Sequence, residues 1–241
     1  MNQLSFILSL LVTSLSGLAA ETLWSTQVYQ TMDRQSELNQ VYFQNVLNNH
    51  ESSLFDWLLV EIDNDNIPEL YDGFDDQLNT PISKDQIREL TTSVYEIHQE
   101  EIDTLIYERY TGESVVQYRI IESIGIDNVE GKMLRKIVAI CPVLEVLDNY
   151  GEHKGYLPLF YVKVHDMESF LRSTSVRYKN DSQQVNFWNL LSNHYYDSVT
   201  YKVSSIYNDK ISSYTKPEDI ELEIQRINNL ILKKEEEIWN Y

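Results

Sequence analysis

The chain has 241 residues, with 19 basic and 38 acidic side chains, so its formal net charge is −19. A chain this acidic is repelled by phosphate backbones and by anionic lipids, which argues against nucleic-acid binding and against adhesion to acidic membranes. Apolar residues make up 42% of the sequence and charged residues 24%, while Gly (7) and Pro (5) are scarce. These proportions are typical of globular proteins, so we expect one compact body without long flexible linkers. The helices and strands predicted below give this body the α+β class.

The N-terminal segment has the pattern of an export signal. An apolar run, Leu4–Leu15, precedes the small residues of 16–20, and it is too short to span a bilayer well. We therefore predict that residues 1–20 are a signal peptide and that 21–241 form a single domain without a transmembrane span; a buried N-terminal helix is the alternative. No Cys lies near the cleavage point, so we expect no lipid anchor, and Cys141 is expected to be a buried, inert thiol.

Helical structure is expected before the middle of the chain. Residues 21–62 contain no Gly or Pro and have apolar residues at a loose helical spacing, which favours a helical N-terminal arm. Ser83 and Gln86 form a capping-box pattern ahead of a second helix. That helix either continues through Val94 and Ile97 or ends early at the Thr/Ser cluster of 91–93.

The middle of the chain has the composition of strands. Residues 115–121, 136–147 and 156–164 are rich in β-branched and aromatic residues, and the segments between them, 127–131 and 148–151, contain turn residues. This order predicts an antiparallel β-meander within a core of residues 83–214, with Pro158 at an edge or a bulge. Helices are expected again at 166–171 and after Asn186, which is a suitable N-cap.

The last segment, residues 215–241, predicts an amphipathic helix. Thr215 to Glu218 has the pattern of a capping box with Pro217 in the first turn. The apolar stripe along the helix consists of Ile220, Ile224, Ile227, Ile231 and Ile238. The stripe suits a helix packed on its own core, or a face shared with a neighbouring subunit.

The sequence lacks the common motifs of catalytic and cofactor sites. It has no His/Cys pair at zinc spacing, no Gly-rich phosphate loop and no nucleophile elbow, so we predict a non-enzyme without a cofactor. The acidic residues Asp63, Asp65 and Glu69 resemble the start of an EF-hand calcium loop. However, Pro68 stands where that loop needs Gly, and Phe74 stands where it needs Glu. We expect a solvated acidic loop here, with a calcium site as the alternative.

Several segments, in this order, resemble the GldN/PorN family over nearly the whole mature chain. They begin with Leu23-Trp24-Ser25 and continue with residues 32–43, 69–76, 116–120 and 135–142. The most specific stretch is Lys154–Tyr161, which is similar to the family's Gly-Tyr-x-Pro-Leu-Phe-Trp signature. The positions that we take over from the family as structural or interface residues are Gly155, Tyr156, Pro158, Leu159, Phe160, Lys202, Tyr207 and Tyr214.

The resemblance implies a subunit of the gliding and type IX secretion machinery of Bacteroidota. Such a protein would lie in the periplasm at the inner face of the outer membrane. It would form a large ring with a GldK/PorK-like lipoprotein and contact a GldM/PorM-like motor subunit. The chain departs from the family at 123–127 and 202–205, which suggests a divergent paralogue. An exported calcium-binding or adhesion module is the alternative function.

Overall fold

The computed structural model describes residues 22–44, 46–47, 50–51, 53–99, 102–127, 132–148, 150–177, 184–204 and 209–239. The predicted signal peptide, most of the predicted turn at 127–131, and Tyr207 lie outside these residues. None of the helices in the described ranges is long and apolar enough to cross a membrane.

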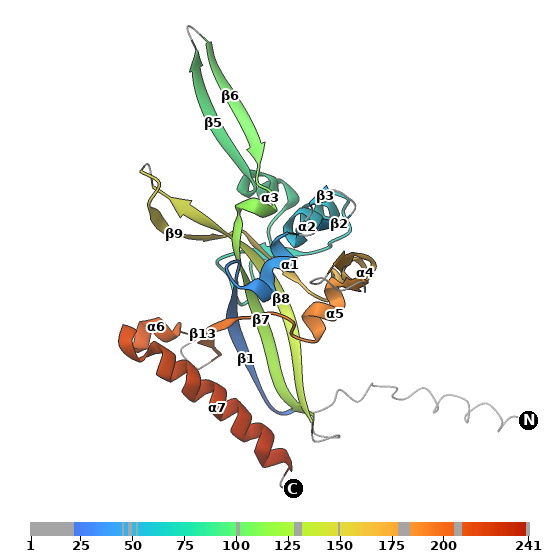
Figure 1. Ribbon diagram of the computed structural model, residues 1–241, viewed down its shortest axis with the longest axis vertical. Coiled ribbons are helices and arrows are strands. Elements are labelled where there is room, and N and C mark those ends of the chain that lie inside the picture. Colours follow the sequence, from blue (N-terminus) through green and yellow to red (C-terminus); the bar gives the residue numbers. More distant parts are fainter. Residues whose placement is uncertain are drawn as a thin grey trace, which may run out of the picture.

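A seven-stranded antiparallel sheet forms the body of the protein (Figure 1). Its strand order is β13-β1-β7-β8-β10-β4, and β9 pairs with β8 beside β10. The bounds of these strands are β1 (Thr22–Asp33), β4 (Leu70–Asp72), β7 (Val115–Asp127), β8 (Met133–Leu147), β9 (His153–Pro158), β10 (Phe160–Lys163) and β13 (Val199–Val203). Each pairing is antiparallel, which confirms the predicted meander and the α+β class.

The third strand of the predicted meander is divided in two. Strand β9 pairs with the end of β8, and β10 pairs with an earlier part of β8. Between them, the Leu159 N–H donates a hydrogen bond to the Pro142 carbonyl at 3.0 Å. Pro158 ends β9, which pairs with β8 alone among the described strands, so its missing N–H interrupts no ladder. The predicted edge position of Pro158 is confirmed.

The predicted helical arm at 21–62 is wrong over its first part. Residues 22–33 form β1, which lies between β7 and β13 and pairs with β7 along nearly its whole length. The segment contains three Thr residues together with Trp24, Val28 and Tyr29, residue types that favour strands, and hydrogen bonding to two distant strands outweighs its loose helical spacing. Among the described residues of this arm, helical turns occur only in η1 (Glu37–Asn39), α1 (Gln40–Phe43) and α2 (Leu54–Asp63).

Helices cover one face of the sheet, and a loop covers the other. Helices α1, α2, α4 (Glu168–Ser173) and α5 (Phe187–Ser192) pack on the first face, where Tyr42, Phe55, Tyr118, Ile140 and Phe160 are fully buried. On the second face, strand residues that point the opposite way are buried, among them Tyr29, Ile121, Cys141 and Tyr161. This is the period of two expected when successive side chains in a strand point to opposite faces. The predicted caps are confirmed at Ser83 and at Asn186, whose Oδ1 accepts a hydrogen bond from the Asn189 N–H at 2.8 Å.

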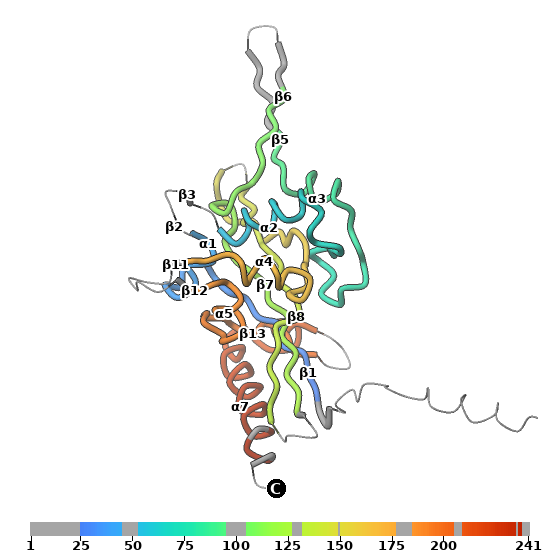
Figure 2. The backbone as a smooth tube through the Cα atoms, turned by 90° about the vertical axis from the view of Figure 1, so that its right-hand side faces the viewer, coloured from blue at the N-terminus to red at the C-terminus, as the bar shows by residue number. Residues whose placement is uncertain are grey.

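The second predicted helix ends early and gives way to a hairpin. Helix α3 (Lys84–Leu90) stops at Thr91, and the chain continues as β5 (Thr92–Gln99) and β6 (Ile102–Arg109). Val94 and Ile97 therefore belong to a strand. Figures 1 and 2 show this hairpin projecting from the upper end of the molecule.

The C-terminal segment contains α6 (Ile211–Tyr214), η3 (Pro217–Asp219) and α7 (Ile220–Trp239), so the predicted terminal helix is confirmed. The predicted capping box is wrong, because the N-cap residue is Lys216 and its side chain makes no capping hydrogen bond. Pro217 lies in the first turn, as predicted. Ile227 is buried, and Ile220, Ile224 and Ile231 are half-buried. The remaining short elements are β2 (Val46–Leu47), β3 (His50–Glu51), η2 (Gly112–Ser114), β11 (Ser175–Arg177) and β12 (Gln184–Asn186).

Candidate interaction surfaces

Each of the three residues predicted as possible calcium ligands forms an ion pair with a different basic side chain. Asp63 pairs with Arg109 at 2.5 Å, Asp65 pairs with Lys84 Nζ at 2.7 Å, and Glu69 pairs with Lys163 Nζ at 3.1 Å. The hydrogen bond from Arg109 is the main cause that lowers the pKa of Asp63. The structure therefore does not bring these carboxylates together around one point. Within the described ranges, no group of three or more His, Cys, Asp or Glu residues is arranged to hold a metal ion.

The second half of the acidic segment closes the second face of the sheet. Asp75 accepts hydrogen bonds from the backbone N–H groups of Gln77, Asn79 and Thr80 at 2.7 to 3.0 Å, so it fixes the loop that follows β4. Asp76 pairs at 2.7 Å with Lys202 of β13. Lys202 is 4% exposed, and its ammonium lies 4.6 Å from the centre of the Tyr29 ring. This family position therefore fastens the loop to the sheet.

The family stretch 155–160 divides into a buried half and an exposed half. Pro158, Leu159 and Phe160 are buried. The loop after β4 passes so closely that a Cβ on Gly73 would lie 2.5 Å from the Pro158 carbonyl oxygen. Tyr156, in contrast, is 46% exposed, and its ring lies 4.7 Å from that of His153. The buried half holds the sheet and loop together, whereas Tyr156 is accessible to another protein, as are Gly155 in part and Tyr214.

A buried carboxylate joins three elements of the body. Glu122 of β7 is fully buried and accepts hydrogen bonds from Gln30 Nε2 at 3.0 Å, His194 Nε2 at 2.6 Å and the Arg135 guanidinium at 2.8 and 2.9 Å. Burial raises the pKa of Glu122, but the hydrogen bonds from His194 and Arg135 outweigh it and hold the pKa below its usual value. Glu122 is thus ionised and satisfied, and it fixes the loop after α5 to the sheet.

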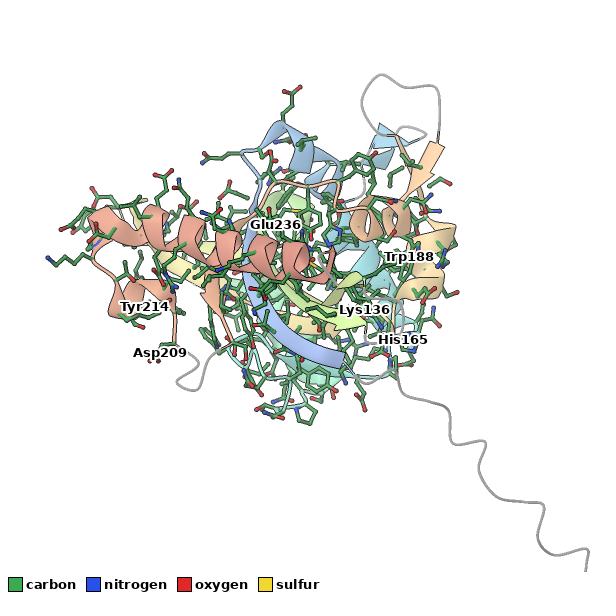
Figure 3. All side chains as sticks on the ribbon, turned by 90° about the horizontal axis from the view of Figure 1, so that it is seen from below. Lys136, His165, Trp188, Asp209, Tyr214 and Glu236 are labelled. Carbon is green, nitrogen blue, oxygen red and sulfur yellow. The ribbon has the colours of Figure 1, made fainter. Side chains whose placement is uncertain are left out.

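Beside this carboxylate lies a groove of about 460 Å³, which we call the flank groove. It is formed by the start of β8, the turn after β10, and helices α4 and α5. Figure 3 shows Lys136, His165 and Trp188 grouped around it. Its lining residues are Leu134, Arg135, Lys136, Ile137, Val164, His165, Glu168, Trp188, Leu191, Ser192 and His194. The groove thus combines apolar walls with several cationic or protonatable groups.

A second cavity, of about 540 Å³, lies between α7 and the end of the sheet. Thr26 of β1 and Val203 of β13 form one wall, and Ile227 and Leu230 of α7 form the other. Tyr214 also lines this cavity; in Figure 3 it lies at the left of the picture, opposite Trp188 at the right. Since Leu230 is exposed while Ile227 is buried, α7 covers this end of the sheet incompletely.

The projecting hairpin exposes apolar side chains outside the body. Val94, Leu105 and Tyr107 are 53%, 54% and 67% exposed. They share one face of the ribbon, because Val94 is paired with Tyr107 and residues 105 and 107 are two apart in β6. In the described structure, β5 and β6 pack mainly on each other, with α3 at their base. The ion pair of Arg109 with Asp63 fixes that base.

Sequence reasoning missed most of these features for a common reason. Glu122, Gln30, Arg135 and His194 are far apart in the chain, so no local motif marks them. The same holds for Asp76 and Lys202. For the hairpin, the sequence did contain a local indication: the Thr/Ser cluster at 91–93 is followed by β-branched and aromatic residues. The spacing of the apolar residues in the same segment was also compatible with a helix.

Comparison with known families covers nearly the whole chain. The family model described as gliding motility associated protein GldN matches residues 19–240. No curated protein matches the chain. The matched range includes the sheet, the projecting hairpin and the terminal helix, so the chain belongs to the GldN family of gliding-motility-associated proteins.

Proposed function

We propose that this protein is a non-catalytic structural subunit of the gliding and type IX secretion machinery. In this role it is exported to the periplasm and works at the inner face of the outer membrane. There it forms a large ring with a GldK/PorK-like lipoprotein and contacts a GldM/PorM-like motor subunit. Membership of the GldN family supports the gliding role.

The observation that carries the structural role is the exposed apolar face of the β5–β6 hairpin. A two-stranded ribbon alone is marginally stable in water, and contiguous exposed apolar side chains are typical of protein interfaces. Two interactions anchor the base of the hairpin to the body: Arg109 pairs with Asp63, and the Tyr110 N–H donates a hydrogen bond to the Thr91 carbonyl at 2.8 Å. It therefore presents its apolar face well outside the body, as expected of a subunit that binds neighbours.

The test is co-purification from the outer-membrane fraction of a gliding host. A C-terminally tagged full-length chain replaces the native copy, and the proteins recovered with it are identified by mass spectrometry. We expect a GldK/PorK-like lipoprotein in comparable amount, a complex of high mass, and loss of gliding and secretion when the chain is deleted. Recovery of the chain without a lipoprotein, together with normal gliding in the deletion strain, would overturn the proposal.

A further inference from the structure

We propose that a pocket on the second face of the sheet binds a carboxylate from a segment of a partner protein, and that Arg119 of β7 recognises this carboxylate. The pocket has a volume of about 340 Å³ and is lined by side chains of β1, β7, β9 and β13 together with Lys210. We call it the Arg119 pocket. It rests on the proposed function only in that a protein partner supplies the carboxylate.

The guanidinium of Arg119 has no acceptor in the part of the chain that the structure describes. Arg119 is half-buried, and its contact is with the ring of Tyr201, whose centre lies 5.8 Å from the guanidinium carbon. A contact with a ring face at this distance leaves the five N–H donors of the guanidinium free. Other arginines pair with carboxylates, namely Arg88, Arg109, Arg135, Arg172 and Arg226. A permanently charged, half-buried side chain without a partner points to an external acceptor.

The neighbours of Arg119 in the sheet do not neutralise its charge. Its cross-strand partners are Thr31 in β1 and Cys141 in β8. Burial raises the pKa of the Cys141 thiol to about 12, and it raises the pKa of the Tyr201 hydroxyl to about 12 as well. Both groups are therefore uncharged at neutral pH, and the positive charge of the guanidinium remains uncompensated by these neighbours.

Two further charged side chains line the pocket. Lys210 is exposed, makes no ion pair with any described residue, and is held in place because its backbone bridges that of Lys202 in β13. Asp33 is acidic, but its Oδ1 accepts a hydrogen bond from the Gln35 N–H at 2.8 Å and its Oδ2 accepts one from Gln117 Nε2 at 3.1 Å. The pocket thus has one basic group in excess. A singly charged carboxylate neutralises this excess, whereas a dianion would leave a negative charge without compensation.

The rim of the pocket has the composition of a protein interface. Tyr156 of β9 and Val199 of β13 line the pocket and are both exposed. Tyr and Arg are enriched among the residues that contribute most to binding between proteins. A peptide carboxylate can reach the guanidinium while the apolar neighbours of that carboxylate contact this rim. We therefore expect an Asp or Glu side chain, or a chain-terminal carboxylate, beside apolar residues of the partner.

Peptide titration followed by NMR tests the pocket. The probes for the ¹⁵N-labelled chain without the signal peptide are the blocked peptide acetyl-Gly-Leu-Glu-Leu-Gly-amide, the same peptide with Gln in place of Glu, that Gln peptide with a free C-terminal carboxylate, and sulfate. We expect one or both carboxylate peptides to shift the amide signals of Thr31, Arg119 and Tyr201 in a saturable way. The blocked Gln peptide and sulfate should bind about tenfold more weakly or less, because they lack the matching single charge.

Two matched substitutions locate the binding. Arg119→Gln removes the guanidinium, and we expect it to weaken binding of the carboxylate peptide by about tenfold or more. Lys136→Gln removes one positive charge from the flank groove, outside the Arg119 pocket, and should bind like the wild type. Circular dichroism and thermal melting check that both variants are folded.

A carboxylate supplied from within the pocket gives a second readout, which also applies if Arg119→Gln does not fold. Thr31 lies opposite Arg119 in the register of β1 and β7, so Thr31→Glu places a carboxylate beside the guanidinium. We expect this variant to melt at a higher temperature than the uncharged control Thr31→Gln. It should also lose peptide binding, because the acceptor site is already filled.

The outcomes separate the pocket from the proposed function. The pocket is wrong if neither carboxylate peptide gives a saturable shift, or if folded Arg119→Gln or Thr31→Glu binds like the wild type. Sulfate binding as tight as that of the peptides would show a site for free anions and overturn the protein carboxylate. A chain that binds no peptide but recovers the lipoprotein in the co-purification contradicts the pocket alone. A chain that binds the peptide but recovers no lipoprotein contradicts the proposed function alone.

Discussion

The body of the protein and its projecting hairpin use similar residues in opposite ways. In the body, Tyr118 and Ile120 of β7 are fully buried between the sheet and the helices. In the hairpin, Tyr107 and Leu105 of β6 are more than half exposed. The residue types are alike, so strand composition alone does not decide burial. What differs is whether a second layer of structure covers the strand: helices cover β7, whereas Leu105 and Tyr107 of the hairpin stay exposed in the described structure.

The largest effect is expected from Phe160→Ala in the body. The Phe160 side chain is fully buried in the main core, so its removal leaves a cavity beneath the helices. We expect the free energy of unfolding to fall by about 3–5 kcal/mol. Urea denaturation followed by circular dichroism measures this change. A loss below about 1 kcal/mol would mean that this part of the family stretch does not hold the core.

An intermediate effect is expected from Glu122→Gln. The substitution keeps the shape but removes the charge that satisfies Arg135 and His194, and we expect a loss of roughly 1–3 kcal/mol at neutral pH. Since the folded-state pKa of Glu122 lies below the ordinary value of 4.5, its ionisation stabilises the protein above that pH. This contribution is lost as the pH falls through the lower folded-state pKa.

Denaturation of the wild type and of Glu122→Gln from pH 7 to pH 3 measures that dependence. The difference in unfolding free energy between the two should shrink as the pH falls below about 4.5. The matched control is Glu108→Gln, an exposed acidic residue of the hairpin, which should follow the wild type. A difference that grows as the pH falls below about 4.5 would contradict the assigned ionisation of Glu122.

The smallest effect on stability is expected from Leu105→Asp in the hairpin. Its side chain is 54% exposed and lies outside the core clusters, so the free energy of unfolding of the isolated chain should change by less than about 0.5 kcal/mol. The same thermal and urea measurements apply. A loss comparable to that of Phe160→Ala would show that the hairpin face is covered by the chain itself, and the contrast between the two regions would be wrong.

Much of the fold is predictable wherever local signals decide it. The capping box at Ser83, the N-cap at Asn186, the meander from Val115 and the edge position of Pro158 all follow from residues within a few positions of one another. The predicted helix at 22–33 fails because β1 is fixed by pairing with β7 and β13, whose residues are far away in the sequence. Long-range pairing overrides a loose local spacing, which is why strand assignments depend on context.

The sequence by itself determined the acidic charge, the amphipathic C-terminal helix, the strands of the meander and the resemblance to the GldN family, since each of these depends on composition, local periodicity or ordered motifs. Only the tertiary structure decided that Asp63, Asp65 and Glu69 face three different cations, that Glu122 joins Gln30, Arg135 and His194, and that the β5–β6 hairpin projects beyond the body. The physical reason is that charge pairing and burial depend on distances in space, and these are set by the antiparallel sheet rather than by separation along the chain.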